Sequence, residues 1–467
     1  MSVSRIFLTL LWVGLLQSSP VFAAPSFFVL DEPREPVAGF EGVALQAMIA
    51  FQAATSDTAI ADTVLISTQN DLIRSILQSN QAIQSLRSSA EAQMVRERYV
   101  GAFPDPTLMV TGQPLPVYTA RGKQVLGIRV EQMIPYPGKL ALMRKMAVIE
   151  AEIGTDKVQS FAVEAILEGQ LALNEINKFT ALRAVNRRFQ ERLDGYEDLA
   201  LRKYEVGEGN QQSVLKIQLE RARLDQSNLE FLRVIEAKKL LIERLVQRPI
   251  KLESTGLSLD GAPRGDPGID GPDQATLELE SRSDLRALSR SLDLATSQKH
   301  LIEYYNRPDF GVSLNWIGIV KSDMPASSDG RDALAIGVSV KIPLGQSSYR
   351  SKKEESQLQI RAIGEQIESS KQSIEDLFTE VNSNTIFDRK SIDHINSSLL
   401  PSAEALIESS VFSYSSARGD FLDLLDAERT RFQLEMERIE LFKRLGAGQL
   451  MLDRISGRLN RLISEQF

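Results

Sequence analysis

The chain has 467 residues, of which 43% are hydrophobic and 6% aromatic, and it carries a net charge of -8. It contains no cysteine and two histidines, His300 and His394, so disulfide frameworks, cysteine metal sites and thiol nucleophiles are excluded. The acidic balance disfavours nucleic acid as a partner. We therefore expect a protein that is not an enzyme and needs neither a metal nor a cofactor.

The N-terminus has the pattern of an export signal. Arg5 precedes an apolar run at 6–16, and a small-residue exit ends at Ala23. Such a run is too short to span a membrane, which takes about 20 residues, but it suits the core of a signal peptide. We predict a signal peptide over 1–23 and a loose leader over 24–62. No later stretch is apolar enough for a membrane helix, so the exported chain is either soluble or crosses a membrane as β-strands.

The segment 64–247 is predicted to form one structural repeat. Helical spacing over 64–99 indicates a first helix, and two alternating segments lie on either side of a loop at 114–123. A long helix over 140–203 follows, then a turn at 204–210 and a return helix. The return helix has apolar residues at alternating spacings of three and four, which is the seam of a coiled coil.

The second alternating segment of this repeat has one apolar and one polar side. Leu126, Ile128 and Val130 share one face, while Arg129 and Glu131 share the other. Successive side chains of a strand point to opposite faces, so this pattern predicts a strand with one face toward an apolar environment and the other toward water.

A Gly- and Pro-rich linker at 248–275 separates this repeat from a second one at 276–456, and a tail covers 457–467. The elements predicted for the second repeat are a helix at 277–305, strands at 310–320 and 333–342, a long helix to about 416 that only Pro401 interrupts, and a return helix to about 456.

The two repeats correspond in order and in spacing. The matching residues are Pro104 and Asp105 with Pro308 and Asp309, Pro135 with Pro343, Tyr204 with Tyr414, and Gly209 with Gly419. Each half therefore reads as helix, strand, strand, long helix and return helix, which indicates an internal duplication.

The apolar faces of the strands are long enough for tilted strands that cross a bilayer. Four strands cannot close a barrel, and an open edge is not tolerated in lipid, so several chains must contribute. Two copies would give a barrel too narrow for an open pore, whereas three copies would give twelve strands. An ordinary sheet in a soluble coiled-coil protein is the alternative.

Several motifs of the sequence resemble those of the TolC family of outer-membrane efflux channels, and the heavy-metal branch is the most similar. The motifs are Pro104-Asp105-Pro106, Ile134-Pro135-Tyr136-Pro137-Gly138-Lys139, the two turns, and Asp423-Leu424-Leu425-Asp426-Ala427. The resemblance covers about residues 64–456.

The resemblance implies a mainly α protein with β-structure. A long α-helical coiled-coil barrel would continue into a transmembrane β-barrel with four strands per chain and twelve in a homotrimer. The barrel would lie in the lipid of the cell outer membrane and the helical tunnel in the periplasm. The channel would be a passive conduit for metal ions or drugs in a tripartite efflux system. An inner-membrane pump, for which the RND type is one candidate, and a periplasmic adaptor (a membrane fusion protein) would deliver the substrate.

Two other functions stay open at this point. A channel of a protein-secretion system would have the same sequence features. A periplasmic coiled-coil scaffold without a pore is the rival from a different class of protein.

The resemblance also assigns candidate site residues. The candidates for the periplasmic tip and gate are Tyr204, Gly207, Gly209, Tyr414, Arg418, Gly419, Asp420, Asp423 and Asp426, and those for the barrel lumen are Arg129 and Glu131. We expect the tyrosines to bond carboxylates of neighbouring helices, the charged residues to form an ion-pair gate, and the glycines to need positive φ. A solvated charged face is the alternative, and it is favoured for Asp426. Ser213 stands where some relatives have a gating Asp, so the resemblance does not extend to a symmetric gate.

Overall fold

The structure, a computed structural model, describes residues 63–252, 277–322, 329–416 and 418–464. They belong to one unit, Asp62–Phe467. The predicted signal peptide, the leader and most of the linker lie outside the described residues. Within these ranges no helix combines the length and the apolar character that crossing a membrane requires.

The order of elements follows the predicted duplication. The first half contains β1 (Val64–Ile66), α2 (Gln69–Ser79), α3 (Gln81–Val100), β2 (Thr107–Thr119), β3 (Gly122–Ile134), α4 (Lys139–Glu205), α5 (Gln211–Val246) and β4 (Ile250–Leu252). The second half contains the 3-10 turn η2 (Leu279–Ser281), α6 (Ser283–Tyr305), β5 (Asp309–Val320), β6 (Ala333–Lys341), α7 (Gln346–His394), the π-helical turn η3 (Ile395–Leu399), α8 (Leu400–Ser415), α9 (Phe421–Ile455) and α10 (Arg458–Ser464).

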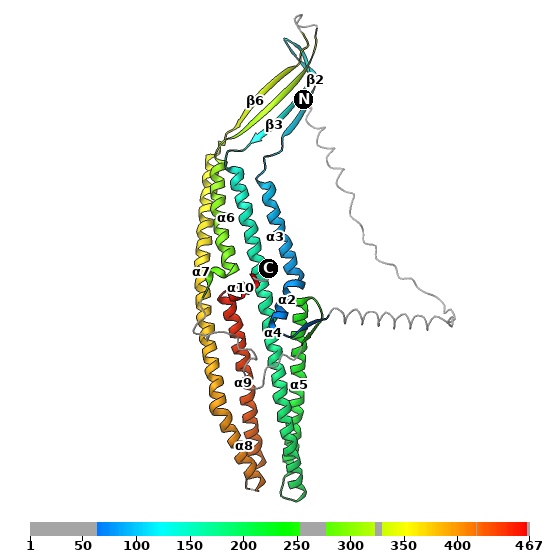
Figure 1. The fold of residues 1–467 in the computed structure, drawn as a ribbon, viewed down its shortest axis with the longest axis vertical. Helices are drawn as coiled ribbons and strands as arrows, with labels where there is room; N and C mark the ends of the chain where they lie inside the picture. The colour runs from blue at the N-terminus through cyan, green and yellow to red at the C-terminus, as the bar shows by residue number, and fades with distance from the viewer. Residues whose placement is uncertain (1–62, 253–276, 323–328, 417, 465–467) are drawn as a thin grey trace, which may run out of the picture. The chain divides into compact units, whose positions relative to one another are not determined.

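Helix α4 is the element on which most of the other helices pack. It has 67 residues, which corresponds to a length of about 100 Å. It contacts α3 and α6 near the sheet and α5 and α9 further along, while α9 also contacts α7 and α8. The helices therefore form a row in the order α5, α4, α9, α8. Figure 1 shows the larger sheet beyond one end of these helices and the two helix turns at the other end.

The prediction of a single helix over 64–99 is wrong. The chain forms the short strand β1 and two separate helices, α2 and α3, over this range. The break lies at Asn80, whose side-chain oxygen accepts hydrogen bonds from the backbone N–H of Ala82 (3.0 Å) and Ile83 (3.1 Å). Its amide donates to the carbonyl of Leu245 at 2.9 Å. Asparagine is a strong N-cap, so these bonds favour the start of a new helix over continuation of the old one.

The predicted loop at 114–123 is mostly strand. Strand β2 continues through Pro114 and Pro116 to Thr119, and its register with β3 shifts between Gly112 and Val117. Among the described residues the larger sheet has the order β2-β3-β5-β6, so β2 is an edge strand. Proline has no N–H for a ladder hydrogen bond, but an irregular edge strand accommodates it.

Two segments predicted to lie outside the repeats contribute to the folded unit. Strand β4, within the predicted linker, pairs in parallel with β1. Helix α10, within the predicted tail, buries Leu459 and Ile463 in the cluster formed by α2 and α4. A three-residue strand and a seven-residue helix are too short to give a clear periodic pattern, so the sequence did not indicate them.

The long helix of the second repeat is interrupted before Pro401. The π-helical turn η3 lies between α7 and α8 and ends two residues before that proline. In a regular α-helix, proline lacks the N–H that would bond to the carbonyl four residues earlier and clashes with that carbonyl, which here belongs to Ser397 within η3.

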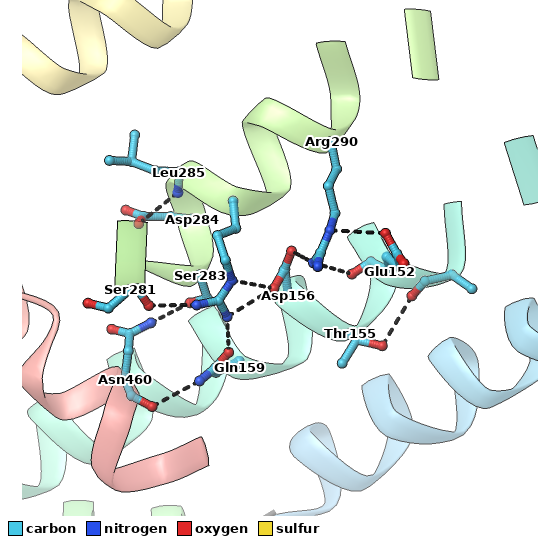
Figure 2. Close-up of polar contacts among 12 residues, drawn as sticks. Glu152, Thr155, Asp156, Gln159, Ser281, Ser283, Asp284, Leu285, Arg290 and Asn460 are labelled. Carbon is cyan, nitrogen blue, oxygen red and sulfur yellow. Dashed lines mark hydrogen bonds and ion pairs between the residues drawn. The ribbon is translucent and has the colours of Figure 1, made fainter. Parts of the chain in front are cut away.

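A buried polar network joins α4 to α6, η2 and α10 (Figure 2). Asp156 of α4 is 3% exposed. Its carboxylate forms ion pairs with Arg286 (3.0 Å) and Arg290 of α6. Gln159 donates to the backbone carbonyl of Asn460 (2.9 Å), and the amide of Asn460 donates to Ser283 Oγ (2.7 Å). The network holds the first two turns of α6 against α4.

Candidate functional site

One face of the larger sheet is apolar from edge to edge. The side chains on this face are Leu108 and Val110 of β2, Leu126, Ile128 and Val130 of β3, Phe310, Val312, Leu314 and Trp316 of β5, and Leu334, Ile336, Val338 and Val340 of β6. Residues opposite one another in an antiparallel ladder point to the same face, so the register brings the predicted apolar faces together. Most of these side chains are exposed in the single chain.

The other face of the sheet is polar and carries Arg129 and Glu131. Arg129 Nε donates to Asn315 Oδ1 at 2.7 Å, and Ser339 Oγ donates to Glu131 Oε1 at 3.2 Å. The predicted alternation of β3 is therefore confirmed, with both charged residues opposite the apolar face. Their hydrogen bonds to β5 and β6 hold the charged groups close to the sheet.

The proline motifs that precede and follow the strands meet where the sheet joins the helices. Lys139 Nζ lies 3.0 Å from Asp309 Oδ2, and the backbone N–H of Tyr136 donates to Asp309 Oδ1 at 2.9 Å. Lys139 Nζ also lies 4.3 Å from the centroid of the Tyr305 ring. These contacts join the segment after β3 to the start of β5 at the junction of the sheet with the helices.

The first turn joins α4 to α5 and contains Tyr204, Gly207 and Gly209. Gly207 has φ +77°, so the predicted positive φ is confirmed there. Gly209 has no positive φ. A Cβ added to it would lie 2.8 Å from the backbone nitrogen of Tyr204, so this position requires glycine for close approach. Tyr204 is 48% exposed.

The second turn joins α8 to α9 and buries Tyr414, which is 7% exposed. Its ring packs against Phe421 with a centroid distance of 5.5 Å. Burial, and to a lesser degree the charge of Asp420, raises the pKa of the Tyr414 hydroxyl. The predicted positive φ at Gly419 is wrong, because this residue is also required for close approach: an added Cβ would lie 2.9 Å from Ser413 Cβ.

The charged residues of the second turn form no ion pair with one another in the described ranges. Asp420 caps α9, with its carboxylate accepting from the backbone N–H of Leu422 at 3.4 Å. Arg418, Asp423 and Asp426 are exposed and form no ion pair in the part of the chain that the structure describes. The charge of Asp420 therefore acts on Tyr414, whereas Arg418, Asp423 and Asp426 are exposed in the single chain.

Lys203 is a residue of this end that no sequence pattern singled out. It is 9% exposed, and its Nζ donates to the backbone carbonyl of Tyr414 at 2.5 Å. Because 211 residues separate the two partners, no local pattern indicates the contact. The sequence shows only a lysine beside the predicted turn, and such a residue is equally consistent with a solvent-exposed side chain.

A second set of polar side chains that the sequence did not indicate joins α4 to α9 at a position further from the turns than Lys203. Glu428 of α9 is buried and accepts hydrogen bonds from Arg192 Nε (2.9 Å) and the Tyr196 hydroxyl (2.7 Å). Burial and the bond to this carboxylate raise the pKa of Tyr196. Among the described residues no three His, Asp or Glu side chains are grouped as a metal site would require.

The duplicated helices and the larger sheet have a fold similar to that of solved outer-membrane channels. No protein-family model and no curated protein sequence matches the chain. Solved structures do match it: the outer-membrane channel OprN is 19% identical with a TM-score of 0.66, and the match covers 83% of this chain and 89% of that one. The outer membrane protein VceC of Vibrio cholerae is 16% identical with a TM-score of 0.66, covering 83% and 96%.

A third similar structure is the open state of the outer membrane channel MtrE of Neisseria gonorrhoeae. It is 15% identical with a TM-score of 0.65, and the match covers 84% of this chain and 89% of that one. These similarities show that the chain has the fold of these channel proteins, as the resemblance of the motifs predicted.

Proposed function

We propose that the chain is the outer-membrane channel of a tripartite efflux system of the TolC type, and that it acts as a homotrimer. The observation that carries this proposal is the larger sheet, whose apolar face is exposed and whose edge strands, β2 and β6, pair with no further strand of the described ranges on their outer sides. In water such a face and such edges would promote aggregation. In a closed barrel within lipid both are satisfied.

Three copies would close the barrel. The strands described in each chain, β2, β3, β5 and β6, would give twelve strands, with β6 of one copy beside β2 of the next. The apolar face would contact outer-membrane lipid, and Arg129 and Glu131 would line the lumen. Fixed by their bonds to Asn315 and Ser339, these charges would influence which ions pass.

The two ends of the helix row support a ring built from copies of the chain. The outer side of α5 exposes leucines at coiled-coil spacing, and α7 and α8 at the other end of the row expose large apolar side chains. The exposed residues of α5 are Leu215, Leu219, Leu229 and Leu240, and those of α7 and α8 are Phe387, Leu406 and Phe412. Contact between α5 of one copy and α7–α8 of the next would cover both and close the periplasmic tunnel.

Replacing Leu229 by glutamate is expected to weaken assembly. Leu229 is 62% exposed in the single chain, and in the proposed ring it packs against a second copy. Loss of this packing would cost roughly 2 kcal/mol at each interface. Leu229→Met keeps an apolar side chain of similar size and is the control. Light scattering on the purified protein should give less trimer for the glutamate variant alone, and equal trimer in both variants would contradict the interface.

At the periplasmic end, we propose that the turns at 204–210 and 414–420 receive the adaptor and that Arg418, Asp423 and Asp426 pair with charges of neighbouring copies. An inner-membrane pump would supply the substrate, with metal ions or drugs as the candidates. Fractionation of cells tests the location: we expect a heat-modifiable trimer in the outer membrane. A soluble periplasmic monomer would contradict the proposal and would favour a scaffold.

A further inference from the structure

The environment of Lys203 is unusual for a charged side chain. The residue lies in the last turn of α4 and is 9% exposed, yet it forms no ion pair among the described residues. Its ammonium group is held by the carbonyl of Tyr414 (2.5 Å) and by the Tyr414 ring, whose centroid lies 4.7 Å from Nζ. A buried ammonium group requires such partners, because it has lost its hydration.

In each turn, backbone N–H groups donate to a carbonyl at or next to one partner of the contact between Lys203 and Tyr414. In the first turn the backbone N–H of Glu208 donates to the carbonyl of Lys203 itself at 2.9 Å. In the second turn the N–H groups of Arg418 (2.9 Å) and Gly419 (3.1 Å) donate to the carbonyl of Ser413, the residue before Tyr414. The bond from Lys203 to Tyr414 therefore connects one turn to the other.

No other polar contact among the described residues joins the two turns as close to their ends. The next contacts between α4–α5 and α8–α9 are those of Tyr196 and Arg192 with Glu428 and that of Glu220 with Arg429. Tyr196 precedes Lys203 by about two turns of helix. The relative position of the two turns therefore depends on Lys203 and on the apolar cluster in which Ala200 and Val214 pack with Tyr414, Phe421 and Leu424.

We propose that Lys203 is the positioning residue that latches the two turns of one chain together and thereby keeps the periplasmic end of the channel narrow. The effect on the pore rests on the proposed function. The connection between the two turns rests only on contacts within one chain. It differs from the expected tyrosine–carboxylate bond, because the cation comes from the first repeat and the acceptor is the backbone of the second.

The latch is tested by amide hydrogen exchange of the full-length protein in detergent. Lys203→Met keeps the aliphatic stem but removes the charged donor, and we expect exchange of the amides of Arg418 and Gly419 to rise roughly tenfold, as loss of a charged hydrogen bond implies. Lys203→Arg should restore slow exchange, because it retains a donor and a cation. Arg202→Met removes the adjacent exposed charge and should change nothing.

Conductance in planar bilayers supplies the second measurement. We expect a several-fold higher resting conductance for Lys203→Met than for the wild type, Lys203→Arg and Arg202→Met. Unchanged exchange in Lys203→Met would overturn the latch, and so would faster exchange with unchanged resting conductance. A wild-type protein that conducts no current at all, together with faster exchange in Lys203→Met, would instead overturn the proposed function and leave the contact between the turns intact. Lys203→Gln repeats both measurements with a neutral polar side chain if the methionine variant does not fold.

Discussion

Replacing Ile336 by arginine is expected to prevent stable insertion into the outer membrane. Ile336 lies in the middle of β6, is 78% exposed in the single chain, and stands opposite Leu314 on the apolar face. In the proposed barrel it faces the hydrocarbon of the bilayer. An arginine at the midplane on the lipid side of a barrel costs about 2–4 kcal/mol, and a trimer would carry three of them.

Ser339→Arg is the matched control for this prediction. Ser339 lies on the same strand but on the polar face, with its hydroxyl 3.2 Å from Glu131 Oε1. An arginine there would have a carboxylate partner and, in the proposed barrel, water. We expect Ser339→Arg to reach the outer membrane as a heat-modifiable trimer and Ile336→Arg to be degraded or lost from that fraction. Equal amounts of both variants in the outer membrane would contradict the assignment of the apolar face to lipid.

Replacing Asp156 by alanine is expected to cause the largest loss of stability within the helical part. Asp156 is 3% exposed and accepts from both Arg286 and Arg290. Removing it would leave the two guanidinium groups without their shared partner at the contact between α4 and α6. Breaking a buried pair in this way costs about 3 kcal/mol, at the low end of the usual range because both arginines are partly exposed.

Glu152→Ala provides the comparison, since Glu152 lies one helical turn earlier and pairs with the same Arg290 at 3.1 Å. This pair is near the surface, so its loss should cost less than about 1 kcal/mol. Urea unfolding in detergent, followed by circular dichroism, should give a clearly lower midpoint for Asp156→Ala than for Glu152→Ala. Similar midpoints would mean that the network in Figure 2 contributes little to holding α6 on α4.

The parts of the fold that the sequence predicted are those recorded in local patterns. The alternation of Leu334, Ile336 and Val338 with small and polar residues indicates a strand with two different faces, and the register of β5 with β6 confirms it. The long helices were predictable for the same reason, because their apolar spacing persists over many turns. The correspondence between the two repeats also indicated where both turns lie.

The parts that the sequence did not predict depend on contacts between distant residues. The partners Asp156 and Arg286 are 130 residues apart, so neither reveals a buried pair by its neighbours. In the sequence, Lys203 cannot be distinguished from other charged residues near helix ends. Its contact with the Tyr414 carbonyl of α8 depends on the tertiary fold. The glycines of the turns were identified correctly, but for Gly209 and Gly419 the reason was wrong, because close backbone approach cannot be distinguished from positive φ in a sequence.

The central claim is that copies of this chain form a pore, and single-channel recording on the purified protein in planar lipid bilayers tests it most directly. We expect discrete current steps from the wild-type protein, larger resting steps from Lys203→Met, and none from Ile336→Arg at equal protein concentration. Wild-type protein that is inserted in the bilayer but produces no current steps, with Lys203→Met equally silent, would contradict the account.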